Sequence, residues 1–172
     1  MNSVGISLGN VCYSAEWAVH NGLRKRKEEG YNTCPFDLMV SNYKGIVKCI
    51  KEDFKYFCDT NYLSLQNNLI FNKYYKFGFN HESPYHANLY LHENWPEGPN
   101  HYVNHNFQHF IERYNNRIQS FRNYLKDPKN IITFIIQFSN EPYPDDDLLE
   151  LKNALLEKYP KLKFELKIIK QN

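Results

Sequence analysis

Two apolar segments near the end of the chain, separated by a helical segment, constrain the fold more than any other feature. Residues 131–138 read Ile-Ile-Thr-Phe-Ile-Ile-Gln-Phe, and residues 162–169 read Leu-Lys-Phe-Glu-Leu-Lys-Ile-Ile. Leucines at helical spacing fill residues 148–155, and Pro144 with the acidic residues 145–147 suits the start of that helix. A strand–helix–strand unit with short connections is parallel and right-handed. The chain therefore predicts an α/β fold with a C-terminal parallel βαβ unit.

A second strand-to-helix junction lies at the start of the chain. Val4 to Leu8 is a short apolar run that predicts a buried strand, and Gly9-Asn10 ends it before a helical pattern over residues 12–27. Cys12 stands in the first turn of this helix, where unpaired backbone N–H groups favour an anion and lower the pKa of a thiol. Free cysteine is also one of the most often buried residues, so a core role for Cys12 stays open.

The rest of the 172-residue chain predicts the other elements of a single domain covering residues 1–172. The patterns indicate helices over residues 42–58 and 106–126, strands over residues 62–71 and 74–79, and a long loop over residues 83–104. The predicted architecture is one mixed sheet flanked by helices.

Composition and charge exclude several classes of function. A net charge of +2, with 23% charged residues, lacks the strong excess of positive charge that is typical of proteins that bind nucleic acid or a membrane surface. The longest apolar runs have about six residues, too few to span a bilayer, and no signal peptide is visible. The four cysteines show no C-x-x-C spacing, which disfavours a zinc ribbon and suits reduced thiols in the cytoplasm.

The remaining residue types favour thiol chemistry. Such chemistry needs a thiolate, a base within hydrogen-bond distance and a group that orients the base. Cys12 supplies the nucleophile, and His81, just past the predicted strand over residues 74–79, supplies a base. Asp37 or Asn140 would orient the imidazole, although the residues around Asp37, taken alone, favour a role as a cap on neighbouring backbone N–H groups. Which of His81, His86 and His105 is the base stays open; the sequence does not decide it.

A histidine cluster offers a metal-dependent alternative. Six of the seven histidines lie between His81 and His109, and His105, His109 and Glu112 have the spacing of one helix face. That face lies opposite the apolar stripe of the predicted helix, which favours a solvated surface cluster. No nucleotide-binding, G-x-S-x-G or H-E-x-x-H motif occurs, so no cofactor is predicted. Arg113 and Arg117 flank the apolar stripe and are expected to pair with carboxylates.

Three segments carry a resemblance to a known family. They are Ser-Leu-Gly-Asn-Val-Cys at residues 7–12, Cys-Pro-Phe-Asp-Leu-Met-Val-Ser at residues 34–41, and the amphipathic helix that leads into Asp53-Phe54. In these segments the chain resembles the DUF1796 family of papain-like cysteine peptidases, which is found in bacteria and large DNA viruses. Phe79-Asn80-His81 and the arginines of residues 113–117 match later, looser parts of the family pattern.

The resemblance extends over roughly residues 4–140, and Leu38 stands where the family usually has a tryptophan. It implies a cysteine-type hydrolase in which Cys12 is the nucleophile, His81 the base, and Asp37 the third member or a structural cap. It also implies a protein or peptide substrate, a location in the cytoplasm (the host cytoplasm for a virus), and a papain-like α+β arrangement as an alternative to the α/β fold. Oligomeric state stays open.

Two other functions compete with this hypothesis. One is a non-catalytic binding module, in which Cys12 is structural and the loop over residues 83–104 contacts a partner protein. The other is metal-assisted hydrolysis through the histidine cluster.

Overall fold

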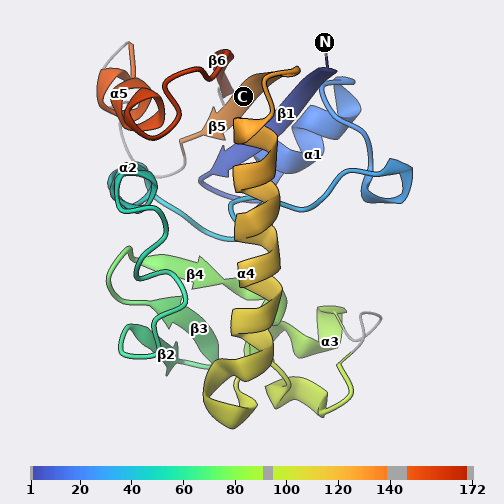
Figure 1. The fold of residues 1–172 in the computed structure, drawn as a ribbon. Coiled ribbons are helices and arrows are strands. Elements are labelled where there is room, and N and C mark those ends of the chain that lie inside the picture. Colours follow the sequence, from blue (N-terminus) through green and yellow to red (C-terminus); the bar gives the residue numbers. More distant parts are fainter. Residues whose placement is uncertain (1, 91–94, 139–146, 170–172) are drawn as a thin grey trace.

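The computed structural model describes residues 2–90, 95–138 and 147–169 (Figure 1). The strands are β1 (Asn2–Gly9), β2 (Leu63–Gln66), β3 (Leu69–Asn72), β4 (Phe77–Phe79), β5 (Asn130–Gln137) and β6 (Phe164–Ile169). The α-helices are α1 (Tyr13–His20), α2 (Tyr43–Lys51), α3 (Ala87–Tyr90), α4 (Asn104–Lys126) and α5 (Leu149–Lys158). Short 3-10 helices are η1 (Lys27–Glu29), η2 (Asn80–Glu82), η3 (Pro84–His86) and η4 (Gly98–Asn100).

The predicted α/β class and the parallel C-terminal unit are confirmed. Strands β1, β5 and β6 form a parallel sheet in the order β1-β5-β6, and α5 connects β5 to β6. Alternate residues of β5 pack in different clusters, because successive side chains of a strand point to opposite faces. Phe134 and Ile136 join the main core beneath α2, α4 and α5, whereas Ile135 packs against Ala18 of α1. Helices therefore cover both faces of the parallel sheet.

The other strands form a separate antiparallel sheet, so the described residues form two sheets in place of the predicted mixed sheet. Its order is β2-β3-β4. The segment predicted as one strand over residues 62–71 is a hairpin, in which Asn67 and Asn68 have φ values of 51° and 62°. Asparagine tolerates this left-handed conformation and is favoured in tight hairpin turns.

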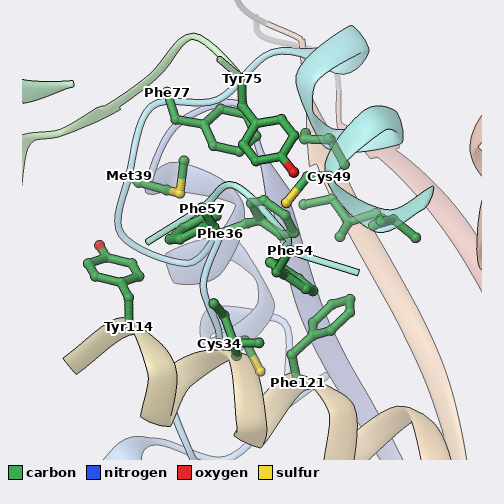
Figure 2. Packing of buried hydrophobic residues seen from close by; sticks show 14 of the residues in the cluster. Cys34, Phe36, Met39, Cys49, Phe54, Phe57, Tyr75, Phe77, Tyr114 and Phe121 are labelled. Atoms are coloured by element: carbon green, nitrogen blue, oxygen red, sulfur yellow. The ribbon is translucent and has the colours of Figure 1, made fainter. Parts of the chain in front are cut away.

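An aromatic cluster joins the two sheets across one core. Phe36, Phe57 and Phe77 are fully buried, and Figure 2 shows Tyr114 and Phe121 of α4 directed into the same cluster. Helix α4 runs alongside both sheets in Figure 1. Its Tyr114 ring contacts Phe79 of β4, and its Phe121 ring contacts Phe134 of β5.

Several element boundaries differ from the sequence prediction because the backbone leaves helical geometry. Helix α1 ends at His20, just before Gly22 with φ 69°, and α2 ends at Lys51, before Asp53 and Phe54 with positive φ. The predicted long loop over residues 83–104 contains η3, α3 and η4. The predicted helix start at residues 144–146 lies outside the described residues. None of the described helices is both long and apolar enough to cross a membrane.

Candidate thiol site

Cys12 lies at the turn between β1 and α1, at the carboxyl end of a parallel strand. Its carbonyl oxygen accepts hydrogen bonds from Ala15 N at 3.1 Å and Glu16 N at 3.2 Å, so Cys12 is the N-cap residue of α1. Ser14 Oγ donates to Gly9 O at 2.6 Å, which closes the turn from inside. Gly9 has φ 107°, and a side chain there would clash with Ser41. The sequence Gly-Asn-Val-Cys is therefore what lets the strand turn directly into the helix.

The thiol pKa of Cys12 is raised, which overturns the expectation that the start of the helix would lower it. The largest cause is partial burial of the thiol, and the negative charge of Glu16 adds to it; a hydrogen bond to the backbone acts in the opposite direction. Burial raises the pKa of Cys34 and Cys49 well above the ordinary value and that of Cys58 to about 12. Cys12 thus has the smallest rise of the four, but it is a thiol, not a thiolate, near neutral pH.

His81 lies in η2, directly after β4, as the sequence indicates. The side chain is partly buried, and its Nδ1 atom is inside the protein. The next residue, Glu82, is completely buried. A rigid strand therefore presents His81 from a short 3-10 turn.

A backbone link connects the two turns that carry Cys12 and His81. Ser41 N donates to Asn10 O at 2.7 Å, and Val40 and Gly78 exchange two hydrogen bonds of 2.8 and 2.9 Å. Cys12 follows Asn10 by two residues, and His81 follows Gly78 by three. The segment of residues 40–41 thus ties the end of β1 to β4.

Asp37 makes the contacts of a structural cap. Its carboxylate accepts hydrogen bonds from Cys34 N at 2.8 Å, from the Tyr31 hydroxyl at 2.8 Å and from Arg24 at 2.9 Å. Asp37 is buried, and Arg24 also stacks over the Tyr31 ring. These contacts fix the turn that precedes residues 38–41. Asn140, the alternative orienting residue, lies outside the described residues.

The other two candidate bases have different surroundings. His86, in η3, is partly buried and its ring contacts that of Tyr85. His105 is 61% exposed, and its Nε2 lies 2.8 Å from Glu97 Oε1. His105 is therefore paired with a carboxylate.

Arg113 and Arg117 pair with a carboxylate, as expected, and the partner is Glu82. Arg117 donates to Glu82 Oε1 at 3.2 Å, Tyr114 donates to the same oxygen at 2.7 Å, and Arg113 Nε lies 3.5 Å from it. Sequence reasoning missed Glu82, because a single glutamate in a turn-like segment gives no pattern that reveals burial.

The fold and the thiol site define an α/β protein with a partly accessible cysteine at the carboxyl end of a parallel strand, which is an edge where ligands bind in open α/β sheets. The chain matches the family described as "Putative papain-like cysteine peptidase (DUF1796)" over residues 3–172, and it belongs to that family. No curated protein and no solved structure matches the chain. The resemblance seen in the sequence is thus confirmed, over essentially the whole chain.

Proposed function

We propose that the protein is a thiol hydrolase that cleaves a peptide, isopeptide or related acyl bond, with Cys12 as nucleophile and His81 as base. The observation that carries the proposal is the position of Cys12, a partly accessible thiol at the carboxyl end of β1. The family description supports the same kind of chemistry.

The raised pKa of Cys12 makes a base necessary in this mechanism. His81 removes the thiol proton as the sulfur attacks the carbonyl carbon, and the resulting imidazolium protonates the leaving amine. The acyl group then stays on the sulfur as a thioester. Water, deprotonated by the same imidazole, hydrolyses the thioester, which releases the acid and restores the Cys12 thiol.

Asp37 acts in this proposal as a positioning residue. Its three hydrogen bonds hold the turn before residues 38–41, and that segment bonds to Asn10 on one side and to Gly78 on the other. Through this path Asp37 supports the spacing between the two turns without contacting the substrate.

The first test is the alkylation rate of each cysteine against pH, read by peptide mass spectrometry. We expect Cys12 to be alkylated faster than the other three cysteines, and His81→Ala to slow it selectively. His20→Ala, which removes an exposed histidine from α1, is the matched control and should change nothing. A Cys12 rate that is indifferent to His81→Ala would remove the proposed base.

The second test is turnover with acyl and ubiquitin-like probes. Cys12→Ala should abolish turnover and leave the circular dichroism spectrum unchanged. Turnover that survives this substitution would refute the role of Cys12.

Removing the charge of Glu16 should make Cys12 more reactive. The carboxylate raises the thiol pKa, so Glu16→Gln lowers it and increases the thiolate fraction at any pH below the pKa. One exposed charge changes the free energy by on the order of 1 kcal/mol or less, which corresponds to roughly a twofold to fivefold faster alkylation at pH 8. Glu150→Gln, at an exposed position of α5, should leave the rate unchanged, and an equal or slower rate in Glu16→Gln would contradict the stated cause.

A non-catalytic binding module is the second candidate, and one surface feature favours it. Tyr85 and Leu89, in the segment from η3 to α3, expose 67% and 64% of their surface although both are large and apolar. A partner protein that covers them would lose affinity in Tyr85→Ala and keep it in Cys12→Ala. The thiol hydrolase predicts the opposite pattern for turnover.

A further inference from the structure

Three side chains near the start of α4 converge on one point. Glu97 Oε2 lies 2.6 Å from His109 Nε2 and 3.6 Å from His101 Nδ1. One ligand-type atom from each residue lies within 4.8 Å of the other two. Two imidazole nitrogens and a carboxylate oxygen at this spacing are a donor set that divalent zinc takes.

The buried side of this cluster is turned toward the same point. His101 is only 7% exposed, and its Nδ1 atom is buried without a hydrogen bond, since Glu97 at 3.6 Å is too far to accept one. The His101 and His109 rings stack at 4.3 Å with an angle of 8° between their planes. A buried imidazole nitrogen that lacks a hydrogen bond normally costs stability, and coordination of a cation would satisfy it.

Two further polar side chains, His105 and Glu112, contact the outer atoms of two of these three residues. His105 Nε2 lies 2.8 Å from Glu97 Oε1, the oxygen that does not face His101 and His109. Glu112 Oε2 lies 3.6 Å from His109 Nδ1, the other ring nitrogen. Carboxylates and imidazoles in these positions orient the ligands of metal sites.

The backbone explains how residues distant along a helix come together. Glu97, His101, His105 and His109 follow one another at intervals of four. In a continuous helix Glu97 and His109 would be about 18 Å apart, too far to share one ion. Residues 105–107 instead have φ values of 54° to 64°, and this left-handed break lets Glu97 and His101, on either side of η4, lie beside His109 of α4.

We propose that Glu97, His101 and His109 bind one Zn²⁺ ion. The ion has two nitrogen ligands and one oxygen ligand from the chain, and its fourth tetrahedral position is left to water or to a donor group in the adjoining cleft. This cleft, of about 1110 Å³, is lined by His101, His109 and Arg113 among others. The nitrogen ligands exclude a site built for Ca²⁺ or Mg²⁺, which take oxygen donors.

The sequence pattern of His105, His109 and Glu112 predicted a solvated surface cluster, and the side chains of His105 and Glu112 are indeed exposed. In the proposed site only His109 of these three binds the ion, whereas His105 lies beside the ligand Glu97 and Glu112 beside the ligand His109. The ion would fasten η4 to α4 in a place where the backbone leaves helical geometry.

The test is Zn²⁺ binding to the full chain, measured by competition with a chromophoric chelator and by the shift in melting temperature. The wild type should bind one equivalent of Zn²⁺ and melt at a higher temperature with it. His101→Ala, His109→Ala and Glu97→Gln should each weaken binding on the order of 100-fold or more, and Glu112→Gln by about 10-fold to 100-fold. His20→Ala is the control that should bind like the wild type.

Co²⁺ gives a readout of the ligands that does not depend on activity or stability. Visible absorption of moderate intensity is expected for a tetrahedral site in the wild type, with its loss in His109→Ala. Circular dichroism of each apo variant shows whether it has folded, and Glu97→Gln, whose side chain is partly exposed, is the mildest change. Binding below one equivalent in the wild type, or equal binding by the wild type and all three ligand variants, would overturn the proposal.

Discussion

Among single residues, Glu82 is a charged group in a position that is completely buried. Its side chain is 0% exposed, yet it is a carboxylate that faces two arginines and the Tyr114 hydroxyl. Burying such a group is tolerated because two arginines match its charge and Oε1 accepts two hydrogen bonds, although Oε2 is buried without one from the described residues. Burial and the charge of Glu82 raise the pKa of Tyr114, so this hydroxyl stays protonated as a donor.

Substitution of Glu82 should be strongly destabilising. Glu82→Gln keeps the shape but leaves Arg117, itself mostly buried, without its counter-charge, and removing one partner of a buried pair costs about 3–5 kcal/mol. Urea unfolding at pH 7 measures the change, with Glu150→Gln as an exposed control expected within about 0.5 kcal/mol of the wild type. A loss below about 1 kcal/mol would mean that solvent already reaches this cluster.

The sequence indicates the role of a residue only where few roles are open to that type of residue in that position. Cys12 could be singled out because a strand-to-helix junction is where thiol chemistry is expected, and Asp37 because a charge among apolar residues needs a partner. The partners themselves could not be predicted: Arg24 and Tyr31 meet Asp37 only in the fold. The raised pKa of Cys12 depends on burial and on Glu16, and burial is a property of the packed structure.

At the scale of elements, α2 shows how a close contact overrides helix propensity. The Asn42 side chain accepts a hydrogen bond from Gly45 N at 2.7 Å, so Asn42 is the N-cap of this helix. Gly45 then lies against the β3–β4 turn. A methyl group on Gly45 would clash with Tyr75 O and come within 2.7 Å of Phe77 Cε1.

Gly45→Ala should therefore destabilise the protein, although alanine is the better helix former. Propensity alone would give a gain of roughly 0.5–1 kcal/mol, whereas overpacking against backbone costs typically about 1–3 kcal/mol. We expect a net loss of about 1 kcal/mol or more in the free energy of unfolding. Lys44→Ala, at the adjacent exposed position of the same helix, should change it by less than about 0.5 kcal/mol, and a more stable Gly45→Ala would show that α2 shifts freely.

Elements with strong periodicity were predictable, and their ends were not. The stripe of Tyr114, Ile118, Phe121 and Leu125 gives α4, and these four residues are buried. Residues 105–107, at its start, have left-handed backbone angles although none of them is a glycine or proline, the residues that would indicate a break in a helix. This break is also what unites Glu97 with His109, so the proposed zinc site could not be found from spacing along a helix.

At the scale of the whole molecule, the two sheets share one core. Ile6 and Phe134 of the parallel sheet and Ile70 and Phe79 of the antiparallel sheet belong to the same buried cluster. The sequence predicted the strands but not their division into two sheets, because strand pairing depends on contacts between segments far apart in the chain. The link from Asn10 through residues 40–41 to Gly78 is one such contact.

This shared core predicts that the chain, proposed as one domain, unfolds in a single cooperative transition. The two tryptophans allow a direct test, because Trp17 packs against the outer cluster of the parallel sheet and Trp95 lies buried beside Tyr102 near the other end of α4. Under excitation that tyrosine does not absorb, Trp17→Phe leaves Trp95 as the only fluorescent reporter among the two tryptophans and 14 tyrosines, and Trp95→Phe leaves Trp17. In each variant, fluorescence and far-ultraviolet circular dichroism should give the same urea midpoint, since neither sheet can keep its buried face once the other separates. Comparing the two signals within each variant removes any effect of the substitution on stability. A fluorescence midpoint that departs from the circular dichroism midpoint in either variant would show that the two sheets unfold as separate units.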